Sequence, residues 1–216
     1  MASTGALLVF TREPVPGHTK TRLIPDVGSV VAAQIHYRLL ERTLDEASNS
    51  NFTAIQIWSY PNIHYVSIKY LAEQHDLSVH RQFGNNLGER MFNALDSALK
   101  EHDFAVIVGS DCPVINTTIY NQAFEVLVNG YEAVLGSCED GGYYLIGSKK
   151  ADYKIFSDIS WGEKNVVEIT RKRFKKTGIK WFETEQLWDV DEIGDVNRLK
   201  SMGSTLLEDL IQTTTL

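Results

Sequence analysis

Short apolar runs alternate with amphipathic stretches along most of the chain. Seven β-rich runs are predicted strands, at 6–10, 53–59, 77–83, 104–108, 132–136, 143–147 and 180–183. Six stretches with helical periodicity separate or follow them, at 30–47, 63–75, 88–100, 117–128, 165–176 and 193–202. In the first of these, Val31, Ile35 and Leu39 recur at the spacing of one helix face. The alternation predicts an α/β protein with a mostly parallel central sheet flanked by helices.

The same pattern bears on domain organisation. Neither an internal repeat nor a low-complexity tract or Pro/Ser-rich linker interrupts the alternation. We therefore expect a single domain over residues 1–202. The Thr-rich tail at 203–216 is expected to hold only a short helix around 206–211.

Composition and charge narrow the classes of partner. Of the 216 residues, 43% are hydrophobic and 23% are charged, which is ordinary for a globular protein. The net charge of −7 makes nucleic acid or an anionic membrane a poor partner and favours a small ligand. Two cysteines without CxxC spacing argue against a zinc ribbon or a disulfide framework. The start lacks a basic signal-peptide region and no membrane span is predicted, so we expect a cytoplasmic protein.

One loop stands out against this acidic background. It reads FTREPVPGHTKTRL and follows the first predicted strand, at the end of an α/β strand where ligands collect. A P-loop is excluded because Thr19, rather than glycine, precedes Lys20, and no GxGxxG follows the strand. Gly17 allows close backbone approach, while Lys20 and Arg22 can neutralise a diphosphate. The alternative is a solvated basic loop that leads into a helix.

Two later segments place carboxylates beyond β-rich runs. Asp111 follows the buried run 104–108 and could hold a divalent cation against phosphates, or simply fix a turn or cap the next helix. Asn116 or Thr117 is better placed for that cap. In the WDVDEIGD segment, Asp189 and Asp191 would share one side of an extended chain and could share a cation. Alternatively, Asp191 or Glu192 stabilises the start of the helix at 193–202.

Two further segments offer polar groups beside sharp turns. The Asp140-Gly141-Gly142 run predicts a tight hairpin. It also removes side chains, so that a sugar or nucleotide could lie against the backbone with Asp140 and Tyr143 at its edge. The segment GNNLGERM offers Asn85 and Arg90 near the same sheet edge, with Asn86 as the expected helix cap.

Five motifs together carry a family resemblance. PGHTKTRL, GNNLGERM, GSDCP, EDGGYYLIGS and WDVDEIGDVNRL match, in order and over nearly the whole chain, an uncharacterised family of GT-A-fold transferases. Its members are commonly described as glycosyltransferases, and some accompany radical-SAM or selenium-related domains. The family is similar at greater distance to 2-phospholactate guanylyltransferase and to the molybdenum-cofactor guanylyltransferases. Trp161-Gly162-Glu163 stands where the family usually has Trp-Ser-Thr.

The resemblance implies a nucleotide-diphospho-sugar transferase fold with Mg²⁺ or Mn²⁺ as cofactor. Asp111 and Asp191 then resemble metal ligands. Asp140, Glu163 and Lys20 are the catalytic candidates, and Gly141, Gly142 and Tyr143 form the acceptor side. The nucleotide and phosphate contacts are expected at Arg12, Gly17, Lys20, Thr21, Arg22, Asn85 and Arg90.

Two reactions, glycosyl transfer and nucleotidyl transfer, could use these residues. In glycosyl transfer, the cation with Lys20 and Arg22 stabilises a departing nucleoside diphosphate while Asp140 or Glu163 deprotonates a small-molecule acceptor. In nucleotidyl transfer from an NTP, a phosphorylated or acidic acceptor attacks the α-phosphate and pyrophosphate leaves. The resemblance favours glycosyl transfer from a sugar nucleotide. A nucleotide-binding module without catalysis is a third alternative.

Overall fold

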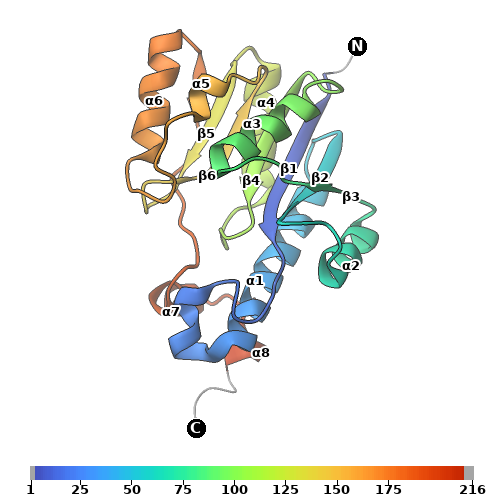
Figure 1. Cartoon of the computed structure of the whole chain (residues 1–216), viewed down its shortest axis with the longest axis vertical. Coiled ribbons are helices and arrows are strands. Elements are labelled where there is room, and N and C mark those ends of the chain that lie inside the picture. The colour runs from blue at the N-terminus through green and yellow to red at the C-terminus, as the bar shows by residue number, and fades with distance from the viewer. Residues whose placement is uncertain (1–2, 212–216) are drawn as a thin grey trace.

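A computed structural model describes residues 3–211 of the chain, in which seven strands form one sheet. The strands are β1 (Gly5–Arg12), β2 (Ala54–Tyr60), β3 (Ser78–Arg81), β4 (Phe104–Gly109), β5 (Ala133–Ser137), β6 (Tyr143–Ser148) and β7 (Trp181–Glu183). Their order is β3-β2-β1-β4-β6-β5-β7, and only β6 runs antiparallel to its neighbours. The expected mostly parallel α/β sheet is confirmed, and each predicted strand overlaps an observed one (Figure 1).

The helices also follow the predicted pattern. They are α1 (Ile24–Ser48), α2 (Val66–His75), α3 (Leu87–Ala98), α4 (Thr117–Val128), α5 (Tyr153–Phe156), α6 (Val166–Thr177), α7 (Ile193–Ser201) and α8 (Glu208–Ile211), with a 3-10 turn at Thr21–Leu23. Gly28 has φ 79° and interrupts α1, so regular helix begins close to the predicted residue 30. Asn86 and Asn116 cap α3 and α4 through their side chains, as expected. Helix α8 lies within the predicted tail, of which residues 212–216 lie outside the described part of the chain.

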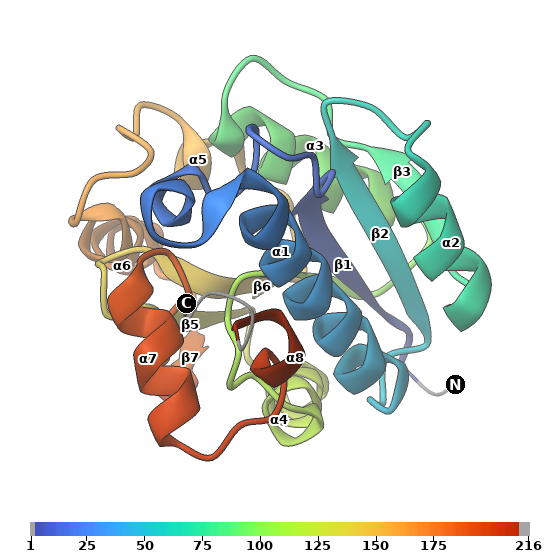
Figure 2. The same ribbon diagram turned by 90° about the horizontal axis from the view of Figure 1, so that it is seen from below.

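Helices cover both faces of the sheet because successive strand residues point to opposite sides. Leu7 and Val9 of β1 pack with α1, α2 and α4, whereas Ala6 and Leu8 pack with α3, α5 and α6. Figure 2 shows the sheet between these two layers. A third cluster, around Leu23, joins the start of α1 to α7 and to the segment before α8. This third cluster brings α7 and α8 beside the start of α1 (Figure 1).

The turn between β5 and β6 is the predicted hairpin, and it requires glycine at its centre. Gly141 has φ 91°, and a Cβ there would lie 2.0 Å from the carbonyl oxygen of Lys164. The close approach is fixed by a hydrogen bond from the Val167 backbone N–H to the Gly141 carbonyl, at 3.0 Å. Packing of the segment before α6 therefore accounts for this glycine.

Replacing Gly141 with alanine is expected to lower the free energy of unfolding by about 2–4 kcal/mol, because the residue must keep a left-handed conformation and displace backbone atoms. Gly142→Ala is the matched control, since the atoms nearest to a Cβ there belong to the Asp140 side chain, at 3.1 Å or more, and not to the backbone. We expect it to cost about 0.5 kcal/mol or less. Urea unfolding of both variants measures the difference, and equal losses would contradict the backbone explanation.

Among residues 3–211, none of the helices combines the length and the apolar character that crossing a membrane requires. The cytoplasmic location expected from the sequence stays a prediction.

Candidate functional site

A pocket of about 430 Å³ opens at the carboxyl edge of β1, β2 and β4. Seven of the residues predicted for the site line it, and they are Arg12, Lys20, Thr21, Arg22, Arg90, Asp111 and Asp191. They come from the first loop, the start of α3, the end of β4 and the segment before α7. The carboxyl edge of a mostly parallel sheet is the usual ligand site in α/β folds, so the fold itself brings these distant residues together.

Lys20 lies between two carboxylates of the pocket, those of Asp111 and Asp191. Its Nζ is 2.8 Å from Oδ1 of Asp111 and 3.1 Å from Oδ1 of Asp191, and its side chain is only 4% exposed. Arg22 Nη1 lies 3.7 Å from the other oxygen of Asp191 and is largely exposed. A buried ammonium thus bridges two carboxylates, and both carboxylates keep an open side, with 42% and 45% of their side chains exposed.

The first loop is built to hold Lys20 in this position. The buried hydroxyl of Thr19 accepts a hydrogen bond from the Val15 N–H at 2.9 Å and faces the carbonyls of Glu13 and Val15. Lys20 itself has φ 49°, a left-handed conformation that L residues adopt at a cost. The ion pairs with Asp111 and Asp191 offset this cost.

Backbone contacts bring Asp191 to Asp111. The Val190 N–H donates to the carbonyl of Asp111 at 3.0 Å, which docks the segment before α7 against the end of β4. Glu192, rather than Asp191, is the N-cap of α7, in a capping box with Asp195. Of the two sequence alternatives, Glu192 therefore takes the helix-capping position, and Asp191 is left to pair with Lys20.

Lys20 and Asp111, together with their charged neighbours, each stabilise the ionised form of the other. Burial alone would lower the pKa of Lys20, but Asp111 and Asp191 outweigh it and raise the pKa. Burial would likewise raise the pKa of Asp111, but Lys20 and His36 hold it well below the usual range. Both groups are therefore charged at neutral pH.

Asp189 differs from its neighbour two residues on. It accepts a hydrogen bond from the Cys138 thiol at 3.2 Å. Burial, reinforced by the negative charge of Asp111, raises its pKa to about 7. Asp191 lines the pocket and Asp189 does not, so the two carboxylates lie in different environments.

His36 is a site residue that sequence reasoning missed. It is buried on α1, with Nδ1 3.3 Å from Oδ1 of Asp111 and Nε2 3.0 Å from the carbonyl of Arg12. Since a carbonyl only accepts, Nε2 carries a proton in this contact. The sequence could have indicated that His36 is buried, because it lies one helical turn from Ala32 and one from Leu40, two buried residues on the same face.

Replacing His36 with leucine is expected to lower the free energy of unfolding by about 1–2 kcal/mol, because the part-buried carbonyl of Arg12 loses one of its donors and keeps only the Thr11 hydroxyl. His64→Leu, at an exposed histidine, is the control and should change stability by about 0.5 kcal/mol or less. Chemical unfolding compares the two. Equal stability of His36→Leu and the wild type would show that the contact contributes nothing.

Other predicted residues lie outside the pocket lining. Asp140 and Glu163 are exposed, and Asp140 accepts a hydrogen bond from the Gly142 N–H at 2.8 Å within its turn. Because β5 runs parallel to β4, this hairpin lies at the same sheet edge as Asp111. Tyr143 packs edge-on against Trp161, with ring centroids 6.2 Å apart. The roles proposed for these residues stay predictions.

Two predicted phosphate contacts are also absent from the pocket lining. Asn85 donates from its backbone and side chain to Oε2 of Glu89, at 2.8 and 3.0 Å, so it belongs to the start of α3. Gly17 has φ 85° and serves the turn of the first loop.

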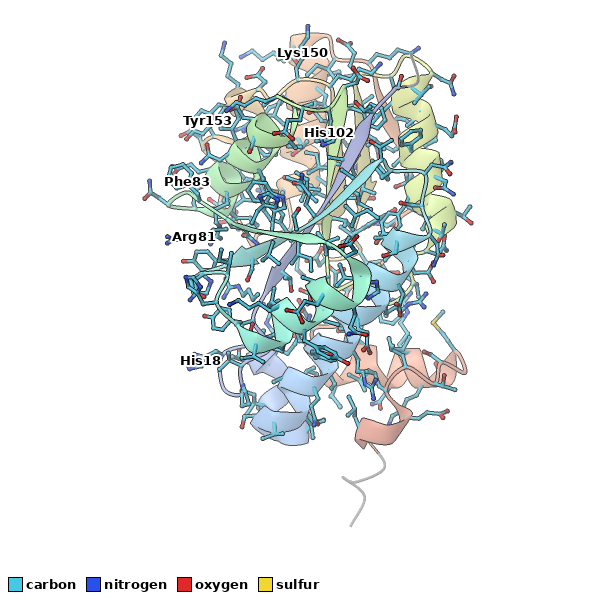
Figure 3. All side chains as sticks on the ribbon, turned by 90° about the vertical axis from the view of Figure 1, so that its right-hand side faces the viewer. His18, Arg81, Phe83, His102, Lys150 and Tyr153 are labelled. Atoms are coloured by element: carbon cyan, nitrogen blue, oxygen red, sulfur yellow. The ribbon has the colours of Figure 1, made fainter. Side chains whose placement is uncertain are left out.

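A second cavity, of about 310 Å³, is lined by residues that include Phe156, Phe174 and Lys150. His18 lines the first pocket, and Figure 3 shows His18 in the lower half of the molecule, far from Lys150 at the top. The second cavity is therefore remote from the carboxyl-edge site.

The carboxylates of the pocket are candidate ligands for a metal ion. Within residues 3–211 there is no cluster of three or more His, Cys, Asp or Glu side chains suited to a metal ion. Oδ1 of Asp111 is buried, so the 42% exposure of its side chain belongs to the remaining atoms, including Oδ2. Hard oxygen donors of this kind fit Mg²⁺ held by one or two carboxylates and substrate phosphates, and not an all-protein cage.

The fold and full-length similarity define the class as a transferase with a GT-A-like fold, as the sequence resemblance implied. A structure from Desulfovibrio desulfuricans G20, described provisionally as a nucleotide-diphospho-sugar transferase, is 28% identical to this chain. Its TM-score is 0.88, and 99% of both chains is covered. The chain belongs to the family described as "uncharacterized protein conserved in bacteria (DUF2064)", which matches residues 43–163. No curated protein matches the chain.

More distant structures share the fold alone. A cytidylyltransferase from Leptospira borgpetersenii serovar Hardjo-bovis (strain JB197) is 18% identical, with a TM-score of 0.61 and 98% of this chain and 94% of that chain covered. Glucosyl-3-phosphoglycerate synthase from Mycobacterium tuberculosis, solved with Mn²⁺, UDP and glucosyl-3-phosphoglycerate, is 9% identical, with a TM-score of 0.56 and coverage of 98% and 80%. Both glycosyl and nucleotidyl transferases therefore occur among proteins of this fold.

Proposed function

We propose that the protein transfers a glycosyl group from a sugar nucleotide to a small acceptor, with Mg²⁺ or Mn²⁺ as cofactor. The observation that carries this proposal is the ammonium of Lys20, buried between Asp111 and Asp191 in the carboxyl-edge pocket. A pocket of about 430 Å³ is within the usual range for small-molecule ligands. The full-length similarity to the Desulfovibrio structure supports the same donor class.

In this proposal the first loop binds the diphosphate of the donor. Lys20 and Arg22 supply positive charge, and Thr21 lines the pocket between them. Asp111 and Asp191 hold the Lys20 ammonium in place, so its position is fixed before the substrate arrives. Preorganised charge of this kind stabilises a leaving group without reorganisation during the reaction.

The residues present fit a divalent cation, as the open side of the Asp111 carboxylate indicates. Asp111, with Asp191 beside it, would hold the ion together with phosphate oxygens of the donor. When bound, the cation would neutralise charge on the diphosphate.

Glycosyl transfer breaks the bond between the anomeric carbon and the diphosphate oxygen, and an acceptor oxygen takes the place of the leaving group. The nucleoside diphosphate departs with the bonding electrons, next to Lys20 and Arg22. The acceptor proton must pass to a base, for which Asp140 and Glu163 are the candidates near this sheet edge.

Nucleotidyl transfer is the second candidate, and one observation favours it. Asp111 and Asp191 are the carboxylates of the pocket lining and both are paired with Lys20, while Asp140 and Glu163 lie outside the lining. An anionic acceptor that attacks an α-phosphate needs no strong base, so this arrangement suits that reaction too.

The products separate the two reactions. The protein is offered sugar nucleotides and NTPs with Mg²⁺ or Mn²⁺, and shifts in melting temperature select ligands, since a ligand at 100 times its Kd adds about 2.7 kcal/mol of stability. Nucleoside diphosphate released from a sugar nucleotide supports glycosyl transfer, and pyrophosphate released from an NTP supports nucleotidyl transfer. Absence of any shift with every nucleotide would contradict both candidates.

A further inference from the structure

The carboxyl-edge pocket contains a second group of positive charge apart from Lys20. Arg12 ends β1 and Tyr60 ends β2, and the two residues are register partners. The guanidinium carbon of Arg12 lies 5.6 Å from the centroid of the Tyr60 ring, and that of Arg90 lies 4.1 Å from it. All three residues line the pocket. One aromatic ring therefore contacts two arginines that lie far apart in the sequence.

These two arginines lack a compensating charge. Among residues 3–211, neither Arg12 nor Arg90 forms an ion pair with a carboxylate, whereas Lys20 has two. The Nε of Arg90 is buried and has no hydrogen-bond acceptor. Burial has the largest effect on the pKa of Arg90 and lowers it; Tyr60 opposes this effect, while the nearby charge of Arg12 adds to it. A buried, unpaired donor beside a like charge is unfavourable unless an anion binds there.

The buried side chain of Gln82 links the ends of β1 and β2, which carry Arg12 and Tyr60. Gln82 is buried, and its Nε2 donates to the carbonyls of Thr11 and Trp58, at 3.1 and 2.8 Å. These carbonyls lie immediately before Arg12 and two residues before Tyr60. The ends of β1 and β2 are thus held together independently of any ligand, as a preformed binding site requires.

We propose that Arg12 and Arg90, supported by Tyr60, form a second oxyanion subsite that binds a carboxylate or phosphate group of the substrate pair. This inference rests on the proposed function only in assigning the first anion, the diphosphate, to Lys20 and Arg22. It adds that the substrates carry a further acidic group, on the acceptor or elsewhere on the nucleotide. Arginine suits the task because its planar fork matches the geometry of carboxylate and phosphate.

The test follows the Nε–Hε resonances of Arg12 and Arg90 by NMR while inorganic phosphate is added to ¹⁵N-labelled, nucleotide-free protein. Both resonances should shift with one apparent Kd. Arg90→Gln should raise the Kd reported by Arg12 at least tenfold, and Arg90→Lys should restore part of the affinity. Lys20→Met should change it by less than twofold, because the proposal assigns Lys20 to the other anion subsite. Arg81→Gln removes an arginine that does not line the pocket and should have no effect.

Arginine resonances that do not respond to phosphate would overturn the proposal, as would an equal loss of affinity in Lys20→Met and Arg90→Gln. Neither result touches the proposed function, which is tested with nucleotides. Repeating the titration with a nucleoside diphosphate and Mg²⁺ bound identifies the source of the anion. Phosphate that still binds at the arginines assigns the subsite to the acceptor, and phosphate that is displaced assigns it to the nucleotide.

Discussion

Lys20→Met is expected to weaken binding of a nucleoside diphosphate about 100-fold while leaving binding of the parent nucleoside within about threefold. A loss of that size corresponds to about 2.7 kcal/mol, which is reasonable for a buried, preoriented ammonium facing a diphosphate. Methionine keeps the length of the side chain and removes the charge. Calorimetric titration of both ligands measures the two affinities, with Lys172→Met, at an exposed lysine of α6, as control.

The same variant should be less stable by about 2 kcal/mol. Breaking a buried ion pair costs about 3–5 kcal/mol, and the partial exposure of Asp111 and Asp191 reduces that figure. Because two carboxylates then face each other without a cation, Mg²⁺ should raise the melting temperature of the variant more than that of the wild type. Equal losses of diphosphate and nucleoside affinity would remove Lys20 from the phosphate site.

Asp111→Asn is expected to remove the metal dependence of nucleotide binding without unfolding the protein. Asparagine preserves the shape, and Lys20 keeps its partner Asp191, so we expect a stability loss of only about 1 kcal/mol. In the wild type, Mg²⁺ should strengthen diphosphate binding at least tenfold, and in the variant by less than twofold. Titrations with Mg²⁺ and with EDTA measure both ratios.

Asp96→Asn is the matched control for this prediction, since Asp96 of α3 pairs with Lys100, which follows the helix, and does not line the pocket. It should keep the full effect of Mg²⁺. An undiminished metal effect in Asp111→Asn would mean that another group holds the cation.

The sequence predicted most of the fold because its hydrophobic periods change at the element boundaries. The run 104–108 is apolar throughout and became the central strand β4, while Asp140-Gly141-Gly142 correctly indicated the turn that makes β6 antiparallel. Helix α5 was not predicted, because four residues are too few to display a helical period. The interruption of α1 at Gly28 shows why its first turn was also missed.

For the site, chain order predicted which residues approach but not how they pair. Lys20, Asp111 and Asp191 were expected at one sheet edge, and they lie there within hydrogen-bonding distance. That the Lys20 ammonium is buried between the two acids depends on the Val190–Asp111 backbone bond, which no local pattern reveals. Tyr60 was missed because an aromatic residue at a strand end has many ordinary structural explanations.

Binding of a metal-associated diphosphate in the carboxyl-edge pocket is the core of the proposed function. It is tested most directly by titrating the wild-type protein with a nucleoside diphosphate and with its parent nucleoside, each with Mg²⁺ and with EDTA. The base is taken from the nucleotide that gives the largest melting-temperature shift. Our account predicts that the diphosphate binds at least tenfold more tightly than the nucleoside and that EDTA abolishes most of this advantage. Equal affinity of the two ligands, in the presence of Mg²⁺, would contradict it.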